Sequence, residues 1–232
     1  MMGSREGSVG IDRARGGART PGTRGRQAAG TREAIMATAE RLFAEHGVTS
    51  VSSRQISEAA GQGNNAAVGY HFGTKAELIR AIVRRHDEVI QQSRRRHVDR
   101  VGAEATAREW VACLVLPLTE HLAAAGATCW YARFLVQMST DPALREIVDD
   151  EVLASAQIAR IGKGLAPCLA GLPTPVREER LQMVRSLLLH TCAERERALA
   201  VSSEAPGPAW EQTSRMLVDA ITGLLLAPVS EA

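Results

Sequence analysis

One short segment, Gln62–Lys75, collects polar and small side chains in the pattern QGNNAAVGYHFGTK. Asn64 and Asn65 offer amide donors and acceptors of the kind that pair with adenine or with phosphate oxygens. Ala66 and Gly69 have little or no side chain, which would let a helix sit close to the edges of DNA bases. We therefore interpret the segment as a surface that another molecule approaches closely, rather than as a buried helix.

Several neighbouring side chains could hold the phosphate backbone of the same nucleic acid. Tyr70 and His71 can donate hydrogen bonds to phosphate oxygens, and Lys75 would add a positive charge where free N–H groups open the next helix. Ser53 and Arg54, at the start of an earlier helix, are placed to contact the opposite strand. Each residue alone could be structural or solvent-exposed, so the prediction rests on the whole set.

A catalytic or metal-binding interpretation has weaker support. His190 and Glu194 lie one helical turn apart in the stretch LLLHTCAERER, but two ligands do not make a metal site. The sequence contains no Ser/His/Asp set, phosphate-binding loop or dinucleotide fingerprint. We therefore expect neither an enzyme nor a metal or cofactor.

The polar segment lies among short helical patterns. Apolar periodicity begins after Thr31, a plausible N-cap, and ends at Gly47. Thr74, with Glu77 three residues later, opens a long helix. Two short helices joined by a glycine-containing turn form a helix-turn-helix, whose second helix enters a DNA major groove. The expected helices span residues 31–47, 53–60, 65–72 and 74–98.

The rest of the chain also shows helical periodicity, without strand-like alternation or an internal repeat. Breaks are expected at Gly126, at Asp141 and in two proline-rich stretches. We predict an all-α fold, with a three-helix helix-turn-helix domain joined to a larger helical domain. The expected domains are residues 31–76 and 77–228, and the later helices are expected at 105–125, 128–139, 142–165, 175–199 and 209–226.

The run from Thr31 to Val83, containing the sequence YHFGTK, resembles the DNA-binding domain of TetR-family transcriptional regulators. The resemblance implies a homodimer that binds a palindromic operator in duplex DNA. It also implies an all-α domain for ligand binding and dimerisation, and release of DNA when a small-molecule effector binds. The family's DNA-contacting positions correspond to Ser53, Arg54, Asn65, Ala66, Gly69, Tyr70, His71 and Lys75.

Unusual side chains gather in the stretch from 105 to 165 and are candidates for the effector site. They recur at three-to-four spacing, which gives one stripe on each helix. Such stripes are usually core, and the alternative is an apolar pocket with a few polar groups. The candidates are Trp110, Cys113, Leu114, Pro117, His121, Trp130, Phe134 and Met138.

Two apolar faces late in the chain are candidates for the dimer interface that the resemblance implies, and an intramolecular core is the alternative. They comprise Leu181, Val184, Leu188, Thr191 and Cys192 on one helix, and Met216 or Leu217, Ala220, Ile221, Leu224 and Leu225 on the last.

Composition and charge narrow the class of protein. The 232 residues carry a net charge of +2, of which residues 1–30 contribute 6 − 2 = +4, so we expect a disordered basic arm there. Four widely spaced cysteines are typical of reduced thiols, and the absence of a long apolar run favours a cytoplasmic protein that is not membrane-bound. An activator, an effector-independent regulator or a redox sensor using Cys113, Cys129 or Cys192 remains an alternative.

Overall fold

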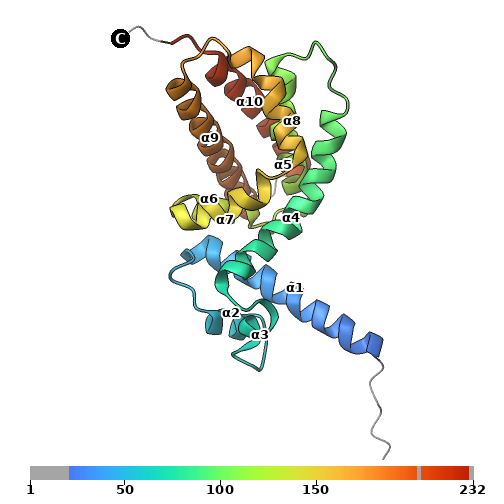
Figure 1. Ribbon diagram of the computed structural model, residues 1–232. Helices are drawn as coiled ribbons and strands as arrows, with labels where there is room; N and C mark the ends of the chain where they lie inside the picture. The colour runs from blue at the N-terminus through green and yellow to red at the C-terminus, as the bar shows by residue number, and fades with distance from the viewer. Residues whose placement is uncertain (1–20, 203–204, 230–232) are drawn as a thin grey trace, which may run out of the picture.

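The computed structural model describes residues 21–202 and 205–229, and within these ranges the chain forms helices and no strands. Ten α-helices account for most of the described chain (Figure 1). This confirms the prediction of an all-α fold. The helices are α1 (Pro21–His46), α2 (Ser53–Ala59), α3 (Ala67–Phe72), α4 (Lys75–Val98), α5 (Ala107–Ala125), α6 (Tyr131–Ser139), α7 (Pro142–Val152), α8 (Ala156–Leu165), α9 (Thr174–Val201) and α10 (Pro206–Leu226).

Side-chain caps fix where the DNA-binding helices begin. The Ser52 side chain accepts from the Gln55 backbone N–H, and the Gln55 side chain accepts from the Ser52 N–H, which forms a capping box at α2. Thr74 caps α4 by accepting from the Glu77 N–H, as its sequence position predicted. Gly73 links α3 to α4 with a φ of 77°, a conformation that glycine adopts without steric cost.

The first three helices and the start of α4 lie together (Figure 1), and their buried apolar side chains belong to one core. Val68 and Phe72 on α3 are buried, as are Ile56 on α2 and Phe43 on α1. Burial of Val68 and Phe72 leaves the opposite side of the short α3 helix facing solvent. The core thus holds the helix-turn-helix in one orientation and exposes its polar face.

Three of the differences from the predicted helix boundaries change the architecture or the site; α5, α6 and α10 begin within three residues of the expected positions. Helix α1 begins at Pro21, so residues 21–30 are helical where a disordered arm was expected, and Thr31 lies within the helix. Residues 1–20 lie outside the described chain. Helix α3 begins at Ala67, which leaves Asn65 in the turn. The expected helix at 142–165 is two helices, because Ser155 caps a new start at α8.

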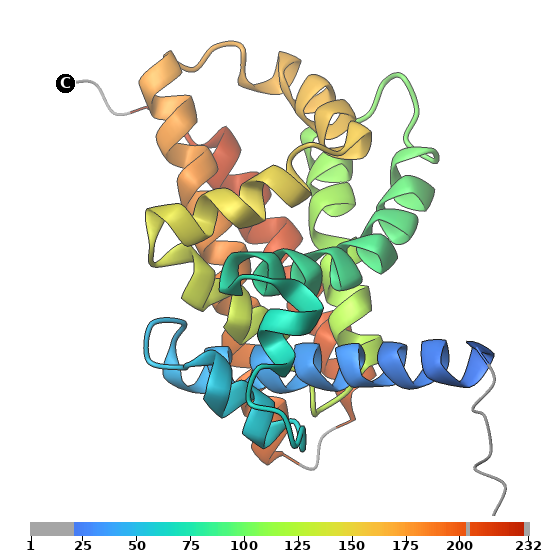
Figure 2. The ribbon, with the colours of Figure 1, turned by 60° about the horizontal axis from the view of Figure 1, so that its bottom comes forward.

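Helices α5 to α10 form the larger unit, and α4 connects it to the DNA-binding helices (Figures 1 and 2). Helix α10 packs on α5 and α9, and α6 packs on α9. Helix α1 also packs directly against α6, so the two units meet along a contact that the sequence did not reveal. Every helix in the described ranges is too short or too polar to cross a bilayer.

Candidate nucleic-acid interface and effector domain

The exposed face of α3 and the turn before it carry the predicted base-contacting residues. Asn65, Ala66 and Gly69 are exposed, and the Tyr70 side chain has 83% of its surface in solvent. A Tyr70 so exposed makes almost no use of its apolar ring within the chain. Burial elsewhere on the helix therefore orients a small polar surface outward.

Gly69 has no internal structural reason to be glycine. It lies inside α3 with helical geometry, and a Cβ added there would meet no atom within 4 Å. Glycine destabilises a helix by about 1 kcal/mol relative to alanine. The missing side chain therefore leaves room for something outside the described chain.

The two asparagines differ in what the structure leaves available. The Asn64 Oδ1 atom accepts from the Ala66 backbone N–H at 2.9 Å, and the Asn64 carbonyl accepts from the Ala67 N–H at 3.0 Å. Asn64 thus shapes the turn into α3. Asn65 is exposed, and its side chain makes no hydrogen bond within the described ranges. Asn65 is the better candidate for reading a base.

On α2, Ser53 is half-buried and Arg54 is exposed. The Arg54 Nε donates to Glu58 Oε1 at 2.7 Å, an ion pair within one helix. Surface pairs of this kind contribute little stability, so the guanidinium can exchange Glu58 for a phosphate oxygen at small cost. The position agrees with a backbone-contacting role.

Lys75 does not point towards a DNA surface. Its Nζ donates to the backbone carbonyls of Val48, at 3.1 Å, and Val51, at 2.7 Å. Two of its three protons therefore hold the segment between α1 and α2 against the start of α4. This internal role does not fit the phosphate anchor that the sequence suggested.

Arg32 on α1 is a structural partner of α3 that the sequence prediction missed. Its Nη1 donates to the His71 carbonyl at 2.7 Å, and its guanidinium lies 4.2 Å from the centre of the Phe72 ring. The contact fixes the C-terminal end of α3 against α1. Beside it, a hollow of about 310 Å³ has Asn64, Tyr70 and His71 in its lining.

Comparison with known proteins identifies this arrangement. Residues 35–82 match the family model described as bacterial regulatory proteins, tetR family. The chain is a TetR-family transcriptional regulator. No curated protein matches the chain in sequence.

Two solved structures show that the TetR-family fold extends beyond the DNA-binding domain. A putative TetR-family transcriptional regulator from Rhodococcus sp. is 14% identical with a TM-score of 0.52, and the match covers 83% of this chain and 99% of that one. A TetR family transcription regulator from Marinobacter aquaeolei VT8 is 15% identical with a TM-score of 0.54, covering 84% and 97%. At these identities the likeness shows the fold alone.

In this TetR-family chain, the predicted effector residues on α6 form part of the contact between the two units. Phe134 is 0% exposed, and its ring stacks on Phe43 of α1 at 6.4 Å between centroids. On its other side Phe134 stacks on Tyr131 at 6.1 Å, and Tyr131 stacks on His86 of α4 at 3.8 Å. Phe134 therefore serves as core at the domain junction, which corrects the pocket-lining role expected for it.

The remaining candidates also pack into the protein. Cys113, Pro117 and Met138 are buried, while Leu114 is half-buried. Neither the hollow beside α3 nor one between α9 and α10 is lined by any of the eight candidate residues. The candidates lie on two helical segments, one stripe on each as predicted from spacing, and the described hollows lie elsewhere.

Each tryptophan candidate has a packing explanation. Trp110 lies against Gly164 of α8, where an added Cβ would come within 2.1 Å of its ring. The Arg133 guanidinium covers the Trp130 ring at 3.7 Å from its centre.

Buried Glu196 of α9 accepts from Arg133 Nε at 2.9 Å and from the Ala132 and Arg133 backbone N–H groups, so it caps α6.

His121 belongs to a buried polar chain that joins α1, α4 and α5. Its Nε2 lies 2.7 Å from Nδ1 of His86, and His86 Nε2 lies 2.9 Å from the Glu40 carboxylate on α1. Burial lowers the pKa of His121 to about 4; His86 and Arg85 lower it too, whereas Glu40 opposes the shift. The imidazole is neutral near neutral pH, which suits a hydrogen-bonded link between the two units.

The three cysteines proposed as redox sensors lack the properties of reactive thiols. Cys113, Cys129 and Cys192 are buried. Burial raises the pKa of all three thiols, that of Cys192 to about 12. A responsive thiol needs a lowered pKa and solvent access. The redox-sensor alternative is therefore wrong for these three residues.

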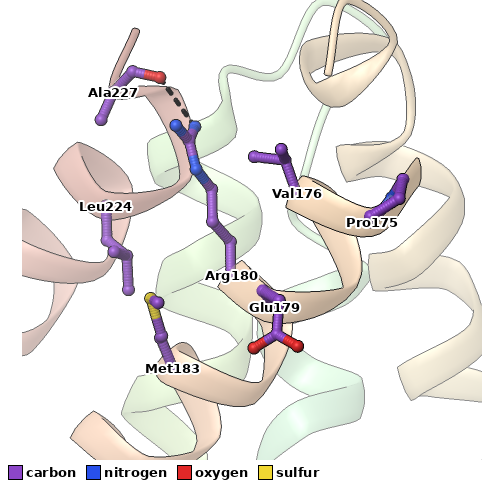
Figure 3. A pocket seen from close by; sticks show the side chains of 7 residues that line it. All are labelled: Pro175, Val176, Glu179, Arg180, Met183, Leu224 and Ala227. Carbon is purple, nitrogen blue, oxygen red and sulfur yellow. Dashed lines mark hydrogen bonds between the residues drawn. The ribbon is translucent and has the colours of Figure 1, made fainter. Parts of the chain in front are cut away.

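Helices α9 and α10 use their apolar residues on two sides. Val184, Leu188, Leu217 and Ile221 are buried within the chain, whereas Met216 is 60% exposed. A hollow of about 360 Å³ is lined by residues of both helices. Figure 3 shows two of them, Met183 and Leu224, with their side chains pointing toward each other. Arg180 closes the end of the hollow by donating to the Ala227 carbonyl at 2.7 Å. An apolar surface thus remains outside the intramolecular core.

Proposed function

We propose that this regulator is a repressor that binds a palindromic operator as a homodimer and leaves it when a small-molecule effector binds. The observation that carries the DNA-binding part is the exposed, small-residue face of α3. Gly69 lowers helix stability without any internal benefit, and Tyr70 on α3 and Asn65 in the turn before it are exposed. Close approach to a major groove accounts for all three features.

The dimer part rests on α9 and α10. Met183 on α9 and Met216 on α10 are about half exposed or more, at 51% and 60%. A second copy of this pair would cover both methionines and form a four-helix interface. A two-fold dimer would present two α3 helices to successive major grooves, about 34–36 Å apart.

The release part rests on α4. This helix begins one residue after the Thr74 cap, directly beside α3, and runs into the larger unit. Arg84 of α4 donates two hydrogen bonds to Glu151 of α7, at 2.7 and 2.8 Å. Because α4 contacts both units, an effector that favours a different tilt of α4 would change the spacing of the two α3 helices. Coupling of about 1–3 kcal/mol would weaken operator binding roughly 5–150-fold.

Selection of bound sequences from a random duplex pool tests the proposal directly. We expect an inverted repeat whose half-sites are centred about one helical turn, 10–10.5 base pairs, apart or a multiple of it. Footprinting on the selected site should protect both halves with two protomers bound. An asymmetric site bound by one protomer, or no enriched sequence, would contradict it.

A further inference from the structure

The inner face of α4 holds polar atoms that nothing in the described chain satisfies. Arg94 is only 4% exposed, yet its Nε and Nη1 atoms donate to no acceptor. The Oε1 atom of Gln91, one turn earlier, is also buried and unpaired. Buried polar atoms are nearly always hydrogen-bonded, so two donors and an acceptor left open on adjacent turns require an explanation.

Asp87 does not supply the missing hydrogen bonds. Its nearest carboxylate oxygen lies 4.0 Å from Arg94 Nη1, which is too far for a hydrogen bond. The Asp87 oxygens instead accept from Gln91 Nε2, at 3.1 and 3.3 Å. Burial lowers the pKa of Arg94 and raises that of Asp87, as expected for two poorly solvated charges that pair imperfectly. The guanidinium therefore keeps free donors in the interior.

The surroundings of Arg94 include buried aromatic and apolar side chains. Tyr131, which is 1% exposed, lies close enough to interact electrostatically with Arg94 and Asp87. On α4 itself, Ile90 and Val98 are buried near Arg94 in sequence. Small-molecule sites are generally apolar, with a few polar groups that fix the orientation of the ligand.

We propose that Arg94 and Gln91 recognise a small monocarboxylate effector that has an aromatic or other apolar body. The planar guanidinium can donate two parallel hydrogen bonds to a carboxylate, and Gln91 Oε1 can accept from a hydroxyl on the same molecule. Asp87 already lies 4.0 Å from Arg94, so a single negative charge adds less unpaired charge to the interior than a phosphate dianion would. The inference rests on the proposed function, because it names the chemistry of the effector.

Binding is tested first with the full chain in the absence of DNA. The three hydroxybenzoate isomers and the matching neutral hydroxybenzamides are titrated by calorimetry. We expect at least one hydroxybenzoate to bind about tenfold or more tightly than its amide, the ratio typical of a charge-assisted hydrogen bond. If no hydroxybenzoate binds more tightly than its amide, the proposal is overturned.

Substitutions on α4 then assign the contact. Arg94→Met keeps an apolar stem and removes the guanidinium, and should weaken carboxylate binding about tenfold or more. Arg95→Met is the matched control, because Arg95 is the adjacent and exposed arginine. Asp87→Asn should have the opposite effect and tighten carboxylate binding, since it removes a like charge near the ligand. Equal affinities in wild type and Arg94→Met would overturn the assignment.

Two further measurements separate failure of this inference from failure of the proposed function. Should Arg94→Met fail to fold, the double variant Asp87→Asn/Arg94→Met removes both buried charges and serves in its place; retained carboxylate binding in that variant would overturn the proposal. Operator binding is measured separately with the same carboxylates. Binding through Arg94 without loss of operator affinity would support this inference and contradict the proposed release mechanism.

Discussion

The face of α3 and the junction of α1, α4 and α6 show opposite relations between side chains and the protein that carries them. On α3, a Cβ added at Gly69 would meet no other part of the described chain, and Tyr70 is largely exposed, with an edge contact to the neighbouring His71 ring. At the junction, Phe134 and Tyr131 are fully buried and stacked in a row with Phe43 and His86. Exposed residues of α3 that lack packing partners in their own chain are candidates for contact with DNA. Buried residues at the junction contribute to the stability of the fold and to the coupling between the two units.

The largest expected effect is at the junction. Phe134→Ala should destabilise the protein by about 3–5 kcal/mol, because it removes a fully buried ring and leaves a cavity. It should also weaken operator binding, since Phe134 supports α1 through Phe43. Urea unfolding measures the first effect and a binding titration the second.

Tyr70→Ala is the matched aromatic control, because Tyr70 is exposed. Its free energy of unfolding should stay within about 0.5 kcal/mol of wild type while operator binding falls. If Phe134→Ala were as stable as Tyr70→Ala, the assignment of Phe134 to the core and of Tyr70 to an exposed contact surface would be contradicted.

Lys75 is expected to behave as a residue of the protein interior. Lys75→Met keeps the apolar stem and removes the bonds to the Val48 and Val51 carbonyls, so it should cost about 1.5–3 kcal/mol of stability. The slope of log affinity against log salt should stay unchanged, because no phosphate contact is lost. A slope reduced by about one unit would restore the phosphate-anchor role.

A pH dependence is expected from His121. Its folded-state pKa of about 4 lies below its usual value of 6.5, so the unfolded chain binds more protons between these limits. The contribution of His121 to the free energy of unfolding is therefore greatest well above pH 6.5 and decreases as the pH falls towards 4. Urea unfolding should show about 2 kcal/mol less stability at pH 5 than at pH 7 from this residue.

His121→Gln isolates the His121 contribution from the other titrating groups. His86, Glu40, Arg85 and Tyr131 surround the imidazole and stay in place in the variant. Between pH 7 and pH 5, we expect the free energy of unfolding of His121→Gln to fall by about 2 kcal/mol less than that of the wild type. Parallel pH curves for the two proteins would contradict the assigned pKa.

Much of the fold was predictable because local signals were strong. The Thr74 cap and most helix positions followed from capping residues and apolar periodicity. The start of α1 was missed because residues 21–30 carry no apolar stripe, and periodicity cannot detect such a helix. The break at Ser155 was missed because an apolar pattern runs across it.

The interior sites could not be predicted for a different reason. Periodicity places Phe134 and Met138 on one helix face, but it does not say whether that face meets a cavity or another helix. The His86–His121 pair and the contact of Glu196 with α6 join residues far apart in the chain. Arg94 looked like one of several arginines on α4, and only burial distinguishes it from Arg95.

Gly69→Ala tests most directly the claim that the exposed face of α3 contacts DNA, because the substitution should change the stability of the helix and the affinity for DNA in opposite directions. A Cβ at this position meets nothing within 4 Å in the described chain, so the substitution should raise the free energy of unfolding by about 0.5–1 kcal/mol. The same methyl group should block close approach to the major groove and weaken operator binding. We predict that operator affinity falls while stability rises. An affinity equal to wild type in a more stable protein would contradict the assignment of this face of α3 to DNA.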